Sequence, residues 1–200
     1  MVKRAEYVQL LVSEVTDELI ISSIAGESKD LGLIKERDGN LYQIYMSGTT
    51  PVALGLALAL PNRRVIALDG DGSILMGLTI LPTIAARNPS NLIVIIFDNE
   101  SYEAAGCIPT FTAGVTDLAE MARGAGIKNV STVKELSEFQ PAIDKAFRAK
   151  DTTFIVAKAE LGYTAGPRLA LDCIENKYRF IRYVEKTENI KVIKPPKKVP

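Results

Sequence analysis

Stretches in which apolar residues recur every three or four positions alternate along this chain with short, continuously apolar runs. The first pattern is typical of helices with one buried face, and the second is typical of strands buried in a sheet. Helices are predicted over residues 3–17, 28–36, 51–60, 74–87, 118–125, 133–149 and 169–183. Strands are predicted over residues 18–22, 41–46, 64–68, 92–97 and 154–157, with a further strand near Val130.

The regular alternation of strands and helices predicts an α/β fold, in which a parallel sheet carries helices on both faces. The run over residues 92–97 is entirely apolar, as expected for a central strand that is covered on both sides. We expect a single domain over residues 1–185, followed by a Lys/Pro-rich tail over residues 186–200.

A long uncharged window over residues 41–62 has about the length that a membrane-spanning helix needs. Its first half contains Gln43, Ser47 and Pro51, so we interpret it as a strand, a polar turn and a buried helix. The start of the sequence lacks the apolar stretch of a signal peptide. We therefore expect a cytoplasmic protein with no membrane partner.

Composition narrows the chemistry that this chain can perform. Lys and Arg number 24 and so do Asp and Glu, so no net charge recruits nucleic acid or an anionic membrane. The chain has no histidine, which excludes a Ser-His-Asp triad and a histidine-ligated metal within it. Cys107 and Cys173 are its only cysteines, which excludes a disulfide framework and an all-cysteine iron–sulfur cluster.

Oxygen-bearing side chains follow two of the predicted strands, namely Asp71 after one and Asn99 after the next. Ligands of parallel sheets bind beyond the carboxyl ends of the strands. Gly70 and Gly72 flank the aspartate, so the backbone can approach a bulky anion closely, and Ser73 begins a helix whose amide groups favour phosphate. Carboxylate, amide and phosphate oxygens form the shell that Mg²⁺ prefers. The pattern predicts a diphosphate bridged by Mg²⁺.

This pattern resembles the signature of the thiamine-diphosphate-dependent enzymes, in which Gly-Asp-Gly is followed by a helix, an apolar strand and an asparagine. The resemblance covers about residues 3–158 and includes Ser28-Lys-Asp-Leu, Met46-Ser-Gly and Leu54-Gly-Leu-Ala-Leu-Ala-Leu. Within the family the chain is similar to the β subunit of sulfopyruvate decarboxylase and to the C-terminal part of phosphonopyruvate decarboxylase. The resemblance implies a thiamine-diphosphate-binding fold, thiamine diphosphate and Mg²⁺ as cofactors, and a 2-oxo acid as the small-molecule substrate that loses CO₂.

The resemblance also implies roles for individual residues. Mg²⁺ would be held by Asp71, the side chain of Asn99 and the carbonyl group of Ser101. Met46 would separate the two rings of the cofactor, and Gly72, Ser73 and Tyr102 would contact its diphosphate. The complete set expected to bind the cofactor is Met46, Ser47, Gly70, Gly72, Ser73, Tyr102 and Ser28. Two of these have an alternative interpretation, since Ser28 could cap a helix and Met46 could pack in the core.

No catalytic residue is expected in this chain. In the family a glutamate beside the pyrimidine ring belongs to a separate pyrimidine-binding domain, for which 200 residues leave no room. We therefore expect that domain on a partner subunit. Glu27 lies in a loop that could approach the site, but the family pattern places no glutamate there. Ser47 stands where the family usually has glycine, and Glu100 and Glu103 flank the metal loop, where they could repel an anionic substrate.

Three alternative functions fit part of the pattern. Asp69-Gly-Asp-Gly-Ser also resembles the motif of haloacid-dehalogenase-like phosphatases, with Asp69 as nucleophile and Asp71 as acid, but the downstream acidic pair of that family is not evident. The thiamine-diphosphate subunit of a 2-oxoacid:ferredoxin oxidoreductase shares the metal motif but usually brings cysteines for a cluster. A scaffold subunit that kept the fold and lost the chemistry is the third alternative.

Overall fold

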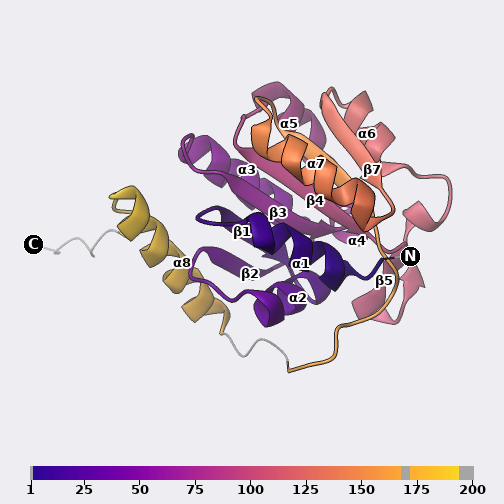
Figure 1. Cartoon of the computed structure of the whole chain (residues 1–200), viewed down its shortest axis with the longest axis horizontal. Helices are drawn as coiled ribbons and strands as arrows, with labels where there is room; N and C mark the ends of the chain where they lie inside the picture. Colours follow the sequence, from indigo (N-terminus) through magenta and orange to yellow (C-terminus); the bar gives the residue numbers. More distant parts are fainter. Residues whose placement is uncertain (1, 168–171, 194–200) are drawn as a thin grey trace, which may run out of the picture.

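A six-stranded parallel sheet forms the centre of this computed structural model, which describes residues 2–167 and 172–193 (Figure 1). In spatial order the strands are β2 (Asn40–Ile44), β1 (Leu19–Ser23), β3 (Val65–Gly70), β4 (Leu92–Asp98), β8 (Thr153–Lys158) and β7 (Asn129–Val133). A short antiparallel hairpin, β5 (Ser101–Tyr102) and β6 (Ile108–Pro109), follows β4 along the chain.

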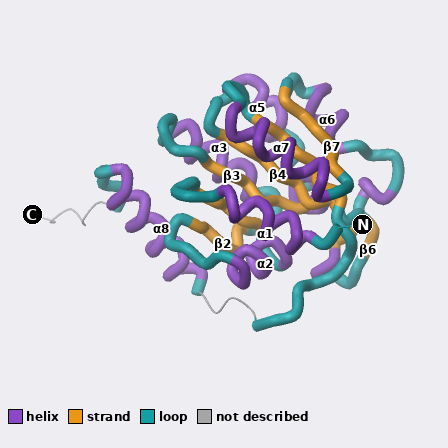
Figure 2. Tube along the Cα trace, viewed as in Figure 1, coloured by secondary structure: helices purple, strands orange, loops and turns teal. Residues whose placement is uncertain are grey.

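Helices cover both faces of the sheet (Figure 2). One face is covered by α1 (Arg4–Glu14), α2 (Gly26–Ile34) and α7 (Leu136–Arg148). The other face is covered by α3 (Thr49–Ala59), α4 (Asp71–Leu75), α5 (Ile80–Arg87), α6 (Leu118–Gly124) and α8 (Cys173–Glu188). Two short 3₁₀ helices, η1 (Glu103–Ala105) and η2 (Phe111–Ala113), lie between β5 and α6 in the sequence. The predicted α/β architecture is confirmed.

The central strands bury almost all of their residues because alternate side chains enter two different cores. In β3, Val65 and Ala67 pack beneath the helices of one face, and Ile66 and Leu68 pack beneath those of the other. Strand β4 follows the same alternation. This explains why the sequence shows continuous apolar runs in these strands and not the polar alternation of a sheet that faces water.

The order of the strands reverses between β1 and β3. The chain leaves β1 through α2 to reach β2 on one side, and it then crosses back through α3 to β3 on the other side. Loops that leave adjacent parallel strands in opposite directions open a crevice at the carboxyl edge of a sheet. The fold therefore places a binding crevice beside the residues that follow β1 and β3.

The helix predicted over residues 74–87 is in fact two helices, since α4 ends at Leu75 and α5 begins at Ile80. The turn between them packs closely on the loop that contains Ser47. A Cβ atom at Gly77 would lie 3.0 Å from the Ser47 Cβ atom and 3.2 Å from its carbonyl oxygen. Periodicity alone misses this break because the apolar spacing continues through the turn.

Other boundaries also differ from the prediction. Val133 ends β7 and does not begin a helix, and α7 starts at Leu136, where Glu135 and Glu138 form a capping box. The predicted 169–183 helix begins at Cys173, after the cap Asp172, and residues 168–171 lie outside the described residues. Helix α8 continues past residue 185, and residues 194–200 of the predicted tail also lie outside the described residues.

Within the described residues, no helix combines the length and the apolar character that crossing a membrane requires.

Candidate cofactor-binding site

A cavity of ≈ 100 Å³ lies at the carboxyl edge of the sheet, where the strand order reverses. Its walls are the segments that follow β1, β2, β3 and β4, together with Arg4 and Tyr163. Eight of the residues expected from the sequence line it, namely Met46, Gly70, Asp71, Gly72, Ser73, Asn99, Ser101 and Tyr102. Ser28 and Ser47 are not among the residues that line it.

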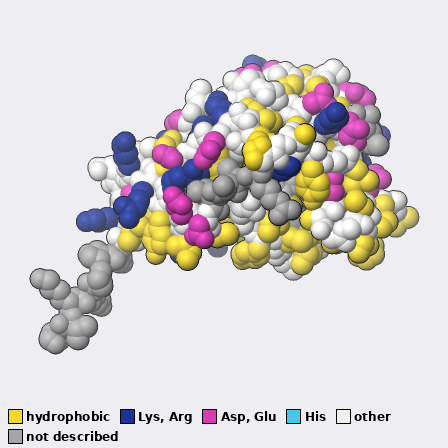
Figure 3. Space-filling model, turned by 90° about the horizontal axis from the view of Figure 1, so that it is seen from below, with side chains coloured by type: hydrophobic (Ala, Val, Ile, Leu, Met, Phe, Trp, Pro, Cys, Tyr) yellow, Lys and Arg dark blue, Asp and Glu magenta, His cyan; other side chains and the backbone are white. Residues whose placement is uncertain are grey.

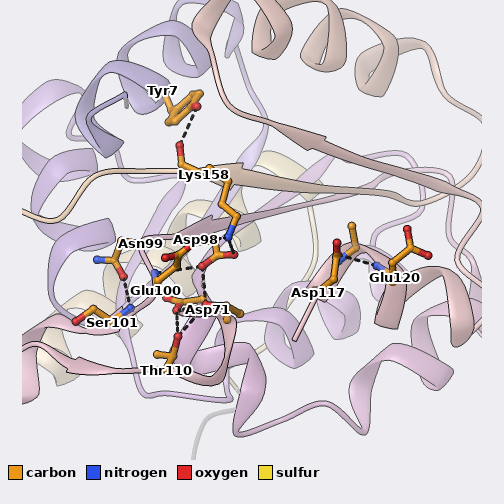
Figure 4. A network of polar contacts seen from close by, with 12 residues as sticks. Tyr7, Asp71, Asp98, Asn99, Glu100, Ser101, Thr110, Asp117, Glu120 and Lys158 are labelled. Carbon is orange, nitrogen blue, oxygen red and sulfur yellow. Dashed lines mark hydrogen bonds and ion pairs between the residues drawn. The ribbon is translucent and has the colours of Figure 1, made fainter. Parts of the chain in front are cut away.

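Asp71 begins α4 and is buried in a cluster of hydroxyl groups and a second carboxylate (Figure 4). The Thr110 hydroxyl donates to Oδ2 of Asp71 over 2.5 Å, and the Thr112 Oγ1 atom lies 3.1 Å from the same oxygen. Thr112 Oγ1 also lies 2.8 Å from Asp98 Oδ1. Burial raises the pKa of Asp71, and the Thr110 hydroxyl opposes that rise. A cation beside this carboxylate would stabilise its ionised form.

The loop after β4 turns sharply and brings two further oxygen donors to the cavity. Glu100 adopts a left-handed conformation with φ of 61°, so Asn99 and Ser101 both face the cavity. The Asn99 Oδ1 atom accepts the Ser101 N–H over 3.1 Å, and its Nδ2 atom donates to Glu103 Oε2 over 3.4 Å. Since a glutamate carboxylate only accepts, this second contact fixes which end of the Asn99 amide carries the oxygen.

The two glycines around Asp71 leave the backbone open on the cavity side. A Cβ atom at Gly70 would lie 3.2 Å from Glu27 Oε1, and one at Gly72 would collide with the Tyr102 ring. Ser73 presents its hydroxyl at the same wall, where Oγ accepts the Ser47 N–H over 3.0 Å. Side chains at the glycine positions would fill the space that a bulky anion needs.

Met46 and Ser47 follow β2, which ends at Ile44 and not at residue 46 as predicted. Met46 is half-buried, lines the cavity and belongs to neither core cluster, so core packing does not explain it. Ser47 adopts a left-handed conformation with φ of 66°. This conformation accounts for the glycine that the family usually has at this position, because glycine reaches it without steric strain.

Replacing Ser47 with glycine is therefore expected to stabilise the fold. Relief of the left-handed strain should add about 0.5–1 kcal/mol to the free energy of unfolding. Ser13→Gly on the exposed side of α1 is the matched control, and it should destabilise by a similar amount because its backbone is helical. Urea denaturation of both variants measures the effect, and a loss of stability in both would contradict the assignment.

Ser28 lies inside α2 and is neither its cap nor part of the cavity wall. Ala25 occupies the cap position, with φ of 72°. The Ser28 hydroxyl is fully buried, donates to the Ser23 carbonyl over 2.6 Å and accepts the Gln43 N–H over 2.7 Å. Since its hydrogen bonds join the ends of β1 and β2, the structure does not bring Ser28 to the site, and the expected helix cap is wrong.

The residues that line the cavity outside the expected set include Arg4, Glu27 and Tyr163, and of these only Glu27 was expected to be able to approach the site. Arg4 is buried, and its Nε atom donates to Asp30 over 2.8 Å. Glu27 is buried at the start of α2, and burial raises its pKa to about 7, against the opposing charge of Arg4. The sequence did contain a signal that Glu27 would line the cavity. Its segment follows a predicted strand, and ligands of parallel sheets bind beyond the carboxyl ends of strands.

Glu27→Gln is expected to stabilise the protein at pH 8 and to change its stability little at pH 5. A carboxyl group whose pKa rises from 4.5 to about 7 on folding favours the folded state at low pH. This contribution to the free energy of unfolding is lost as the pH rises from about 4.5 to 7. The loss amounts to at most about 3 kcal/mol. Thermal unfolding at both pH values measures the difference. Glu14→Gln on the exposed end of α1 is the control, and an equal gain at both pH values would contradict the assignment.

Glu100 and Glu103, the two glutamates in the segment after β4, are both paired with cations. Lys158 Nζ lies 2.9 Å from Glu100 Oε1, and Arg4 Nη1 lies 3.4 Å from Glu103 Oε2. Gly162 N–H also donates to the Glu103 carboxylate. These contacts reduce the repulsion of an anionic substrate that unpaired carboxylates would cause.

Asp69 does not face the cavity and cannot act as a phosphatase nucleophile. Its side chain is fully buried, and Oδ2 accepts the Thr50 hydroxyl of α3 over 2.8 Å. A nucleophile must reach the phosphorus atom of its substrate, which this position does not allow. The haloacid-dehalogenase-like alternative therefore lacks its central residue.

The family model described as "Thiamine pyrophosphate enzyme, C-terminal TPP binding domain" matches residues 39–157. This segment includes the ends of β2, β3 and β4, which supply most of the cavity wall. The chain belongs to this family. The sequence-based assignment to the thiamine-diphosphate-dependent enzymes is confirmed.

Two relatives match most of the chain. It is 34% identical over 187 residues to "Sulfopyruvate decarboxylase subunit beta" of Methanocaldococcus jannaschii, which covers 92% of this chain and 98% of the relative. It is 31% identical over 148 residues to "Phosphonopyruvate decarboxylase" of Streptomyces viridochromogenes, which covers 74% of this chain and 37% of the relative. The second relative is therefore much longer than this chain.

Solved structures share the fold. The thiamine diphosphate-dependent 4-hydroxybenzoylformate decarboxylase of Rhodococcus jostii RHA1 superposes with a TM-score of 0.64 at 22% identity. Benzoylformate decarboxylase of Polynucleobacter necessarius superposes with a TM-score of 0.65 at 19% identity. The matches cover 81% and 82% of this chain, which spans about a third of each solved chain.

Proposed function

We propose that this chain is the thiamine-diphosphate- and Mg²⁺-binding subunit of a 2-oxo acid decarboxylase that needs a pyrimidine-domain partner. The observation that carries the proposal is the meeting of Asp71 and Asn99, from the ends of two adjacent strands, at one cavity. The match to 98% of a sulfopyruvate decarboxylase β subunit supports the substrate class, a 2-oxo acid with a second acidic group.

The donor set of the cavity fits a divalent cation. Both threonine hydroxyls contact Asp71 Oδ2, which leaves Oδ1 as the oxygen for a metal. The Asn99 amide is held with its Nδ2 atom on Glu103, so its oxygen keeps a lone pair for a second bond. The carbonyl group of Ser101 would be the third protein ligand. A carboxylate, an amide and a carbonyl group are the hard oxygen ligands that Mg²⁺ takes.

The diphosphate of the cofactor would lie against Gly70, Gly72 and Ser73, with Tyr102 beside it. The absence of side chains at the two glycines permits a close approach, and Mg²⁺ would offset the negative charge of Asp71 and the phosphates. Glu27 stands over Gly70 and must be neutral or move aside for an anion to enter. When bound, the cofactor supplies a carbon nucleophile and stores the electron pair that is left when CO₂ departs.

A partner subunit is needed because this cavity is only part of an enclosed site. Its ≈ 100 Å³ is well below the roughly 300–1,000 Å³ of sites that enclose a ligand. Ile24 and Tyr163 line the cavity, yet each is 45% exposed. Hydrophobic side chains gather over the face shown in Figure 3, and large ones that stay exposed favour a covering partner. The partner would contribute the pyrimidine-binding domain and its glutamate.

The test of this function is CO₂ release from sulfopyruvate, phosphonopyruvate and pyruvate. Each acid is supplied to this chain together with a pyrimidine-domain subunit, thiamine diphosphate and Mg²⁺. We expect one of the two acids with a second acidic group to be consumed faster than pyruvate. No CO₂ from any of the three acids, with cofactor bound, would contradict a decarboxylase and favour the oxidoreductase alternative or an inert scaffold.

A further inference from the structure

Two threonines that lie outside the Gly70-Asp71-Gly72 motif contact the Asp71 carboxylate. Thr110 and Thr112 follow the short strand β6, and both are almost completely buried. Their hydroxyls lie 2.8 Å from each other and both contact Asp71 Oδ2, and Figure 4 shows Thr110 pointing at this carboxylate. Thr110 is the extended residue that precedes the 3₁₀ helix η2, and Thr112 lies within that helix, so one short turn presents both hydroxyls to one carboxylate.

The segment is anchored to the same loop that carries the other expected metal ligands. The Thr110 N–H donates to the Glu100 carbonyl over 3.0 Å, between Asn99 and Ser101 in the sequence. The hydroxyl of Thr110 then spans 2.5 Å to Asp71 at the end of the neighbouring strand. One residue therefore joins, by its backbone and by its side chain, the two loops that would share a metal ion.

Thr112 extends the connection to a third strand. Its hydroxyl contacts Asp71 over 3.1 Å and Asp98 Oδ1 over 2.8 Å, and Asp98 Oδ2 pairs with Lys158 over 2.8 Å. Asp98 and Lys158 are register partners on β4 and β8. The Thr112 hydroxyl therefore lies between the Asp71 carboxylate and an ion pair that joins two neighbouring strands of the sheet.

We propose that Thr110 and Thr112 are positioning residues for the Mg²⁺–diphosphate site. By occupying Asp71 Oδ2, they fix the orientation of the carboxylate and leave Oδ1 for the metal. Partners of this kind orient metal ligands, and their loss typically weakens metal binding by about 10–100-fold. The inference rests on the proposed function, because it concerns the cation that this cavity would hold.

The test replaces the hydroxyl groups while keeping the shape of the side chains. Thr110→Val, Thr112→Val and the double variant are compared with Thr153→Val. Thr153 is a matched control, since it is also buried but its hydroxyl contacts no hydrogen-bond partner among the described residues. Equilibrium dialysis of the full chain, assembled with its partner, measures bound thiamine diphosphate as the concentration of free Mg²⁺ is raised.

Each single valine variant is expected to need at least about ten-fold more Mg²⁺ for half-maximal binding of thiamine diphosphate, and the double variant more still. Thr153→Val should match the unmodified protein. Thr112→Ser keeps the hydroxyl and should also match it, which tests the proposal even if Thr112→Val does not fold.

An unchanged Mg²⁺ requirement in the valine variants, or a ten-fold loss in Thr112→Ser, would overturn the positioning role alone. If the unmodified protein takes up no thiamine diphosphate at any Mg²⁺ concentration, the proposed function is overturned and the positioning role with it. The two failures are therefore separated by the result for the unmodified protein.

Discussion

Replacing Asp71 with alanine is expected to abolish Mg²⁺-dependent binding of thiamine diphosphate. The variant removes the one carboxylate that we assign to the metal, and the remaining donors of the site, an amide and a carbonyl group, are uncharged. Without the metal bridge, the diphosphate would face the Glu27 carboxylate, which lines the cavity beside Gly70. We expect a loss of affinity of about 100-fold or more, measured by calorimetry with Mg²⁺ and with a chelator.

A carboxylate outside the cavity provides the control for Asp71. Asp117 caps α6, where its side chain accepts the Ala119 and Glu120 N–H groups. Asp117→Asn removes the same charge and keeps a good capping residue. It should leave cofactor affinity unchanged. Equal affinity of Asp71→Ala and the unmodified protein would show that Asp71 does not hold the metal.

The second large effect concerns the partner subunit. This chain alone is expected to decarboxylate 2-oxo acids at least about 10²–10⁴-fold more slowly than the assembled enzyme, because the partner's glutamate supplies general acid–base help. Two glutamates line the cavity, Glu27 and Glu103. Glu27 lies over Gly70, where the diphosphate would bind. It is therefore poorly placed to act on the pyrimidine ring.

Single-turnover release of CO₂ measures this difference, with cofactor saturating in both samples. A variant of the partner that lacks its pyrimidine-side glutamate is the control, and it should reduce the assembled enzyme to the rate of the isolated chain. Full turnover by this chain alone would mean that it contains its own catalytic acid. Glu27→Gln would then show whether that acid is Glu27.

The cavity could be predicted in large part because its walls follow strands whose ends are visible in the sequence. Asp71 and Asn99 come directly after the most apolar runs, and parallel strands bring such ends to one edge of the sheet. These predictions needed only local pattern and the direction of the strands. The left-handed conformation of Ser47 was not predicted, although the glycine that the family usually has there is consistent with it.

The remaining site residues depend on contacts between distant segments, which local pattern does not encode. Arg4 reaches the cavity from the first helix, and Tyr163 reaches it from the segment after β8. Thr110 and Thr112 lie at the start of and within the three-residue 3₁₀ helix η2, which is too short to give a periodic signal. Ser28 shows the opposite error, because its hydroxyl bonds within the β1–β2 edge and not to the cavity.

The most direct test of the account is a crystal structure of the assembled enzyme with thiamine diphosphate and Mn²⁺ in place of Mg²⁺. Anomalous scattering locates the Mn²⁺ ion independently of any assumption about its ligands. We predict one site within bonding distance of Asp71 Oδ1, the Asn99 side-chain oxygen and the Ser101 carbonyl oxygen, with the diphosphate against Gly72. A metal ion bound elsewhere, or a diphosphate that does not contact the Gly70–Ser73 segment, would contradict the account.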